Sequence, residues 1–114
     1  MSLTQAYILL AISILLEVTA TGSLKATEGF TRWMPSFISI ISISLCMFFM
    51  SHVMKILPVS ITYATWSGIG IVLLTLVGIL KYKQIPNLAT IFGLTLIIIG
   101  VIIVNFMNDI KINN

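Results

Sequence analysis

One acidic residue stands inside a long apolar stretch of the sequence. Between Leu3 and Leu24, Glu17 is the only charged side chain, about two-thirds of the way along. An acidic residue at the centre of a membrane span costs roughly 2.5 to 3.5 kcal/mol, so groups retained at such depth usually serve transport or proton transfer. Because no basic residue lies at comparable depth to pair with it, we predict that Glu17 takes up and releases protons. The structural alternative is a protonated carboxyl held by a hydrogen bond between helices.

Small and weakly polar residues share a helical face with Glu17. Residues three or four positions apart are neighbours on a helix, which places Ser13, Ala20 and Thr21 beside the carboxyl group. Ile14 lies near the same face. Small side chains leave room for a ligand, although the same stripe is also typical of close helix packing.

An aromatic pair lies in the third apolar stretch. Tyr63 and Trp66 are three residues apart, so both rings project from one helical face. Aromatic faces attract organic cations, most strongly away from water, and together with an acidic residue they suit a lipophilic cation. The alternative is an interfacial aromatic belt, but Trp66 lies too deep in its stretch for that. Gly68 and Gly70 follow the pair and permit close backbone approach or a kink.

The composition requires a bilayer to position these residues. Of the 114 residues, 59% are hydrophobic and 8% are charged, whereas average soluble domains carry roughly 25% charged residues. A helix needs about 20 mostly apolar residues to cross a bilayer, and backbone groups in lipid must be hydrogen-bonded within their own segment. The sequence therefore predicts an all-α membrane protein, a single domain over 1–114 with transmembrane helices at about 3–22, 34–53, 58–80 and 87–107.

The remaining charges and motifs narrow the function. The six basic residues are spread along the chain without forming a patch, which excludes nucleic acid as a partner. More of them fall in the first and third loops than elsewhere, which favours a cytoplasmic position for these loops but leaves both insertion directions open. We find no metal-ligand cluster, phosphate loop or nucleophile constellation, so we expect neither an enzyme nor a cofactor or metal site.

End to end, the chain resembles the small multidrug resistance family of bacterial four-helix, proton-coupled exporters. The resemblance is carried by Glu17-Val18, by the first loop from Lys25 to Ser36, by Pro58, by the run from Tyr63 to Gly70, and by the run from Gly93 to Val101. It implies a multi-pass protein of the bacterial inner (plasma) membrane. It also implies an antiparallel dimer, in which the first three helices of each subunit line a shared pocket and the fourth provides the dimer contact.

The resemblance further assigns roles to single residues. Glu17 matches the membrane carboxylate for which protons and substrate compete. The other assigned positions are pocket walls (Trp66, Tyr63), pocket-lining residues (Ser13, Ile14, Thr21), a kink in the third helix (Gly68, Gly70) and the dimer interface of the fourth helix (Gly93, Gly100).

The function that we predict is proton-coupled antiport of hydrophobic organic cations such as quaternary ammonium compounds and cationic dyes. Ala20 stands where members that export guanidinium compounds carry a tryptophan, whereas Ile43 stands where some quaternary-ammonium exporters have a pocket tyrosine. The alternatives are export of guanidinium or polyamine-type metabolites, one obligate subunit of a paired heterodimeric transporter, and a membrane partner without transport activity. Homodimer and heterodimer, and fixed and dual topology, all remain open at this point.

Overall fold

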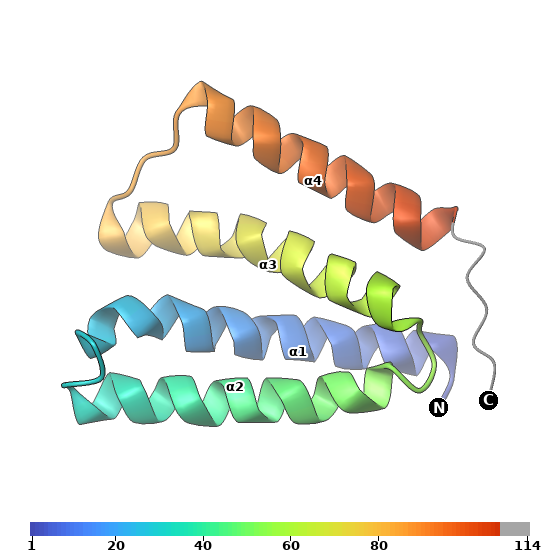
Figure 1. Cartoon of the computed structure of the whole chain (residues 1–114), viewed down its shortest axis with the longest axis horizontal. Helices are drawn as coiled ribbons and strands as arrows, with labels where there is room; N and C mark the ends of the chain where they lie inside the picture. Colours follow the sequence, from blue (N-terminus) through green and yellow to red (C-terminus); the bar gives the residue numbers. More distant parts are fainter. Residues whose placement is uncertain (108–114) are drawn as a thin grey trace.

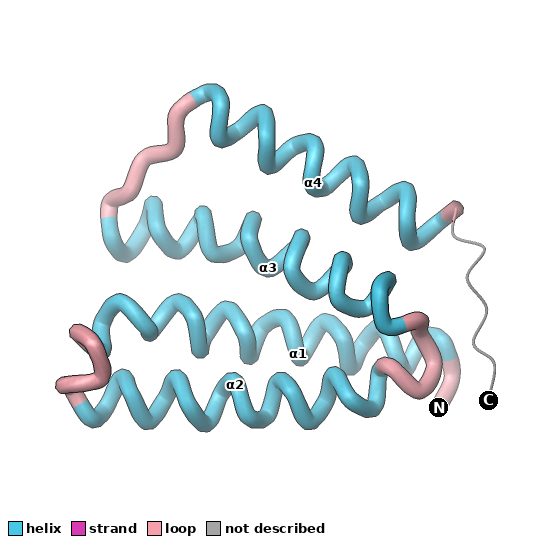
Figure 2. Tube along the Cα trace, viewed as in Figure 1, coloured by secondary structure: helices cyan, strands magenta, loops and turns pink. Residues whose placement is uncertain are grey.

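The computed structural model describes residues 1–107, and every regular element in that range is helical (Figures 1 and 2). The long helices are α1 (Leu3–Leu24), α2 (Trp33–Val53), α3 (Val59–Tyr82) and α4 (Leu88–Phe106), and a short 3-10 turn, η1 (Lys25–Thr27), follows α1. All four long helices are long and apolar enough to cross a membrane. The prediction of an all-α chain with four helices long and apolar enough to span a membrane is therefore confirmed. The helix ends lie one or two residues from the predicted ones, as is usual at helix termini.

Local signals in the sequence begin and end these helices. Ser2 and Gln5 form a capping box at the start of α1: the Gln5 backbone N–H donates to Ser2 Oγ at 3.2 Å, and the Ser2 N–H donates to Gln5 Oε1 at 2.9 Å. At the end of α3, Lys83 adopts the left-handed conformation (φ 55°) and the Gln84 N–H turns back to the Gly78 carbonyl at 2.9 Å. This termination stops α3 at Tyr82 and turns the chain toward α4.

The helices lie side by side, with α1 between α2 and α3 and with α4 outermost (Figure 1). α1 and α2 share a buried apolar core made of Ala6, Leu10, Ile14, Cys46, Met50, Val53 and Leu57. Near the other end of this interface, Ser39 Oγ of α2 donates to the Ala20 carbonyl of α1 at 2.7 Å. Large apolar side chains cover the outer surfaces of all four helices, which suits hydrocarbon rather than water.

A polar chain ties α4 to the rest of the bundle. The Tyr7 hydroxyl of α1 donates to Asn105 Oδ1 of α4 at 2.7 Å, and Asn105 Nδ2 donates to Thr65 Oγ1 of α3 at 2.7 Å. Apart from this chain, α4 is held loosely, because Val101 is its only buried residue. Asn105 thus connects three helices at the end of the bundle where the N-terminus and the second loop lie (Figure 1).

We predict that Asn105→Ala loosens α4, because it removes the partner of both Tyr7 and Thr65. Hydrogen bonds between membrane helices contribute about 0.6 kcal/mol on average and up to about 1.7 kcal/mol, so the free energy of unfolding should fall by about 1 kcal/mol in a detergent titration. Ile103→Ala is the matched control on the same helix, since Ile103 is 50% exposed. An equal decrease in the free energy of unfolding in both variants would contradict a stabilising role of the Asn105 hydrogen bonds.

Candidate substrate and proton site

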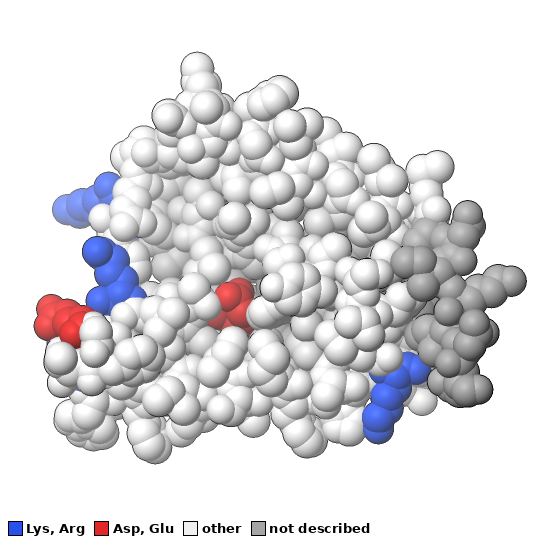
Figure 3. Space-filling model, viewed as in Figure 1, with Lys and Arg blue, Asp and Glu red and all other residues white. Residues whose placement is uncertain are grey.

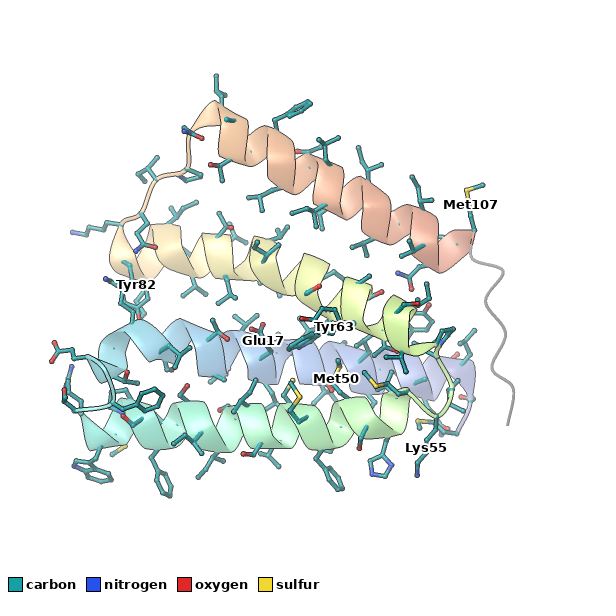
Figure 4. The ribbon with its side chains drawn as sticks, viewed as in Figure 1. Glu17, Met50, Lys55, Tyr63, Tyr82 and Met107 are labelled. Carbon is teal, nitrogen blue, oxygen red and sulfur yellow. The ribbon has the colours of Figure 1, made fainter. Side chains whose placement is uncertain are left out.

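Glu17 lies near the middle of the bundle, far from the charged ends (Figures 3 and 4). It is half-buried, and the space-filling view shows acidic atoms in the middle of the molecule, surrounded by uncharged residues, whereas the other coloured charges lie toward the two ends (Figure 3). Thr21, one turn later on α1, donates its hydroxyl to Glu17 Oε1 at 2.7 Å. One carboxylate oxygen is therefore satisfied within α1, while one side of the group stays open.

The two glycines of α3 face different neighbours. A methyl group added at Gly70 would lie 2.9 Å from Glu17 Oε2, so the carboxylate rests against the α3 backbone at this residue. A methyl group added at Gly68 would instead collide with the Val101 side chain of α4. Gly70 thus positions the carboxylate, and Gly68 lets α4 approach α3. α3 is helical throughout from Val59 to Tyr82, and a kink at these glycines stays a prediction.

The predicted aromatic pair is brought together. The Tyr63 and Trp66 rings meet edge to face, with centroids 5.2 Å apart and an interplanar angle of 66°. Tyr63 is 58% exposed, whereas Trp66 is half-buried against the α1–α2 core. The indole N–H of Trp66 is buried and has no hydrogen-bond partner among the described residues. Tyr63 thus presents a largely exposed ring near the start of α3, seven positions before Gly70, the residue that lies beside the Glu17 carboxylate.

The other residues predicted to line a pocket divide into two groups. Thr21 contacts the Glu17 carboxylate directly. Ser13 is fully buried and donates its hydroxyl to the Leu9 carbonyl of its own helix at 2.9 Å, and Ile14 belongs to the α1–α2 core. In this conformation Ser13 and Ile14 are buried in the packing of the bundle, and their contact with substrate stays a prediction.

The glycine stripe of α4 faces open space. A methyl group added at Gly93 or at Gly100 would meet no atom within 4 Å among the described residues. Gly100 lines a cleft of about 440 Å³ between α3 and α4, together with Gly68 and Val101. Bare glycines allow close approach of another helix, and a dimer contact through Gly93 and Gly100 stays a prediction.

The sequence did not predict two sets of hydrogen bonds that join the helices around the site. The Tyr7–Asn105–Thr65 chain joins residues that are up to 98 positions apart, and the Tyr82 hydroxyl donates to the Gly22 carbonyl across 60 positions. Asn105 is a polar residue inside an apolar helix, so it needs a hydrogen-bond partner. Nothing in the sequence identifies that partner. A tyrosine at a helix end reads only as an interfacial residue.

Comparison with known proteins decides the family. The Small Multidrug Resistance protein family matches residues 5–97. The chain belongs to the small multidrug resistance family. It is 48% identical over 99 residues to the quaternary ammonium compound-resistance protein QacC of Staphylococcus sp. (strain ST827), covering 87% of this chain and 92% of that protein.

More distant relatives cover the same region of this small multidrug resistance protein. It is 41% identical over 103 residues to the quaternary ammonium compound-resistance protein QacG of Staphylococcus sp. (strain ST94), covering 90% of this chain and 96% of the relative. It is 39% identical over 99 residues to the multidrug resistance protein EbrA of Bacillus licheniformis, covering 87% and 94%. The family assignment confirms that the chain is a bacterial membrane transporter and not an enzyme.

We predict that alanine at one α3 glycine mainly weakens cation binding, whereas alanine at the other mainly lowers stability. Gly70→Ala should displace the flexible Glu17 carboxylate at little cost in stability and weaken tetrapropylammonium binding roughly tenfold, which equals about 1.4 kcal/mol. Gly68→Ala should overpack Val101, lower the free energy of unfolding by about 1 to 3 kcal/mol, and change affinity less.

The two variants control for each other, because each gains the same helix propensity of about 0.8 to 1 kcal/mol when alanine replaces glycine. Isothermal titration calorimetry gives the affinity and detergent unfolding gives the stability. Weaker binding in Gly68→Ala than in Gly70→Ala would contradict the assignment of Gly70 to the carboxylate.

Proposed function

We propose that this chain exports hydrophobic quaternary ammonium cations in exchange for protons. The observation that carries the proposal is the placement of Glu17, the one acidic side chain within the helices of residues 1–107, with an open side in the middle of the bundle. Attraction between charges is much stronger in a low-dielectric interior than in water. A single carboxylate at this depth can therefore hold either a cation or a proton.

Competition for the carboxylate couples the two flows. A bound cation favours the ionised form of Glu17 and so expels a proton. A returning proton neutralises the same group and removes the attraction that held the cation. The Thr21 hydroxyl donates to Glu17 Oε1 at 2.7 Å and so orients the group that both flows share. Access to the site must then alternate between the two sides of the membrane.

The aromatic pair supports a quaternary ammonium cargo. Such a cation has no N–H to donate, so it is held by charge and by aromatic faces rather than by hydrogen bonds. Tyr63 offers an exposed ring, braced edge to face by Trp66 at 5.2 Å. The relatives QacC and QacG are named for resistance to quaternary ammonium compounds.

The surroundings of Ala20 argue against a guanidinium exporter. Ala20 is 2% exposed, and its carbonyl accepts the Ser39 hydroxyl at 2.7 Å in the tight contact between α1 and α2. A tryptophan at this position, as the guanidinium exporters of the family carry, would force the two helices apart. The packing at Ala20 therefore favours the quaternary ammonium subtype over guanidinium cargo.

A second, antiparallel copy would complete the site. The open side of Glu17 leaves the cargo without a full wall in a single chain, and the Gly93–Gly100 stripe of α4 offers an unoccupied contact surface. Such a dimer would bring two copies of Glu17 to one shared site. A paired heterodimer would use the same surfaces, with a homologous subunit as the partner.

We predict that the chain, purified alone and reconstituted into liposomes with a pH gradient, drives tetrapropylammonium uptake, and that Glu17→Gln abolishes it. Glutamine keeps the size of the side chain but carries neither the charge nor the titratable proton. Efflux of dye from whole cells that express the same variants provides a second measurement.

The outcomes separate the alternatives. Transport by the chain alone excludes an obligate heterodimer and a membrane partner without transport activity, while loss of transport in Glu17→Gln supports the coupling role. Proton-driven transport that persists in Glu17→Gln would overturn the mechanism. Gradient-driven transport of guanidinium in preference to tetrapropylammonium would overturn the substrate class.

A further inference from the structure

The last turn of α3 reaches across to α1. The Tyr82 hydroxyl donates to the Gly22 carbonyl at 2.6 Å, a short hydrogen bond between two different membrane helices. Gly22 directly follows Thr21, the residue whose hydroxyl holds the Glu17 carboxylate. Figure 4 shows Tyr82 at the end of α3, next to the end of α1. The bond therefore lies at the end of the bundle formed by the first and third loops, about one turn of α1 beyond the proton site.

A cleft of about 340 Å³ occupies this region between α1 and α3. Its lining includes Thr21, Gly22, Lys25, Val77, Tyr82 and Gln84. Thr21 marks the inner part of the cleft, since it touches Glu17, whereas Lys25 and Gln84 mark the part nearest the loops. The cleft thus runs from the loop side toward the residue that holds the carboxylate, and Tyr82 forms part of its wall.

Two ammonium groups hold the Tyr82 ring in this position. The Lys25 Nζ lies 5.9 Å from the ring centroid and the Lys81 Nζ lies 5.4 Å from it. Both distances fall within the range of a cation–π interaction. The two positive charges also oppose the passage of a cationic cargo while the ring stays between the helices. The ring, its hydroxyl bond to Gly22 and the two lysines are thus gathered at the loop end of the cleft.

We infer that Tyr82 is a positioning residue for transport, whose hydroxyl latches α3 to α1 and closes the cleft on the side of the first and third loops. Access to Glu17 from that side requires the Tyr82–Gly22 bond to break. The role of the latch in the transport cycle rests on the proposed function, but the latch itself does not, because its opening can be measured without any transport.

The test is the alkylation rate of a cysteine inside the cleft. Cys46 is the one native cysteine, so Cys46→Ala provides the background, and Val77→Cys places a reporter opposite Gly22. In the purified full chain, we expect Tyr82→Phe to speed the reaction of this reporter with a membrane-impermeant maleimide by about three- to tenfold, the effect of losing one net hydrogen bond.

Two controls separate a latch from general loosening. Tyr7→Phe removes a hydroxyl at the opposite end of α1 and should leave the Val77→Cys reporter unchanged. A second reporter, Ile69→Cys, lines the cleft near Tyr7 and Asn105 and should react at the same rate with and without the Tyr82 hydroxyl. Tetrapropylammonium affinity at the Glu17 site should also stay the same in Tyr82→Phe.

The result supports the latch when only the Val77→Cys reporter reacts faster in Tyr82→Phe. An unchanged rate at that reporter overturns the inference, and so does an equal acceleration at both reporters. If Tyr82→Phe opens the cleft while the wild-type chain, reconstituted alone, transports no cation, export by this chain alone fails and the latch stands, so the two failures are distinguishable.

Discussion

A carboxyl group inside hydrocarbon has to find polar partners, bind a cation or give up its charge, and in this protein that group is Glu17. Its surroundings meet this need only in part. Thr21 satisfies one oxygen at 2.7 Å, Gly70 removes the side chain that would otherwise fill the space beside the other oxygen, and one side is left open. A carboxylate with an open side in a low-dielectric interior attracts a cation much more strongly than it would in water. The exchange chemistry that we propose follows from this shortage of partners.

The packing of the other helices leaves Glu17 with few polar partners. α1 and α2 are locked together by an apolar core and by the Ser39–Ala20 hydrogen bond, so the face of α1 that carries Glu17 is presented toward α3. Hydrogen bonds connect α1 with its neighbours on both sides of Glu17, through Tyr7 at one end and through Tyr82 at the other. Such polar contacts are few and individually weak in membranes, which suits helices that must rearrange.

The sequence alone predicted the four spanning helices to within two residues, because charge, proline and apolar length are strong signals in a membrane protein. It also singled out Glu17 and brought Thr21 and the Tyr63–Trp66 pair to the right faces by helical spacing. Helical spacing cannot reveal which faces of different helices meet. For this reason three features emerged only from the three-dimensional packing: the contact of Gly70 with Glu17, the full burial of Ser13, and the hydrogen bond from Tyr82 to Gly22.

The competition between protons and cations for Glu17 is tested most directly by proton release. Tetrapropylammonium is added to the purified chain in weakly buffered detergent solution, and the pH change is followed as the cation binds. We predict a release of protons that saturates together with cation binding and disappears in Glu17→Gln. Saturable cation binding that releases no protons near neutral pH, where the exchange must operate, would contradict the shared site.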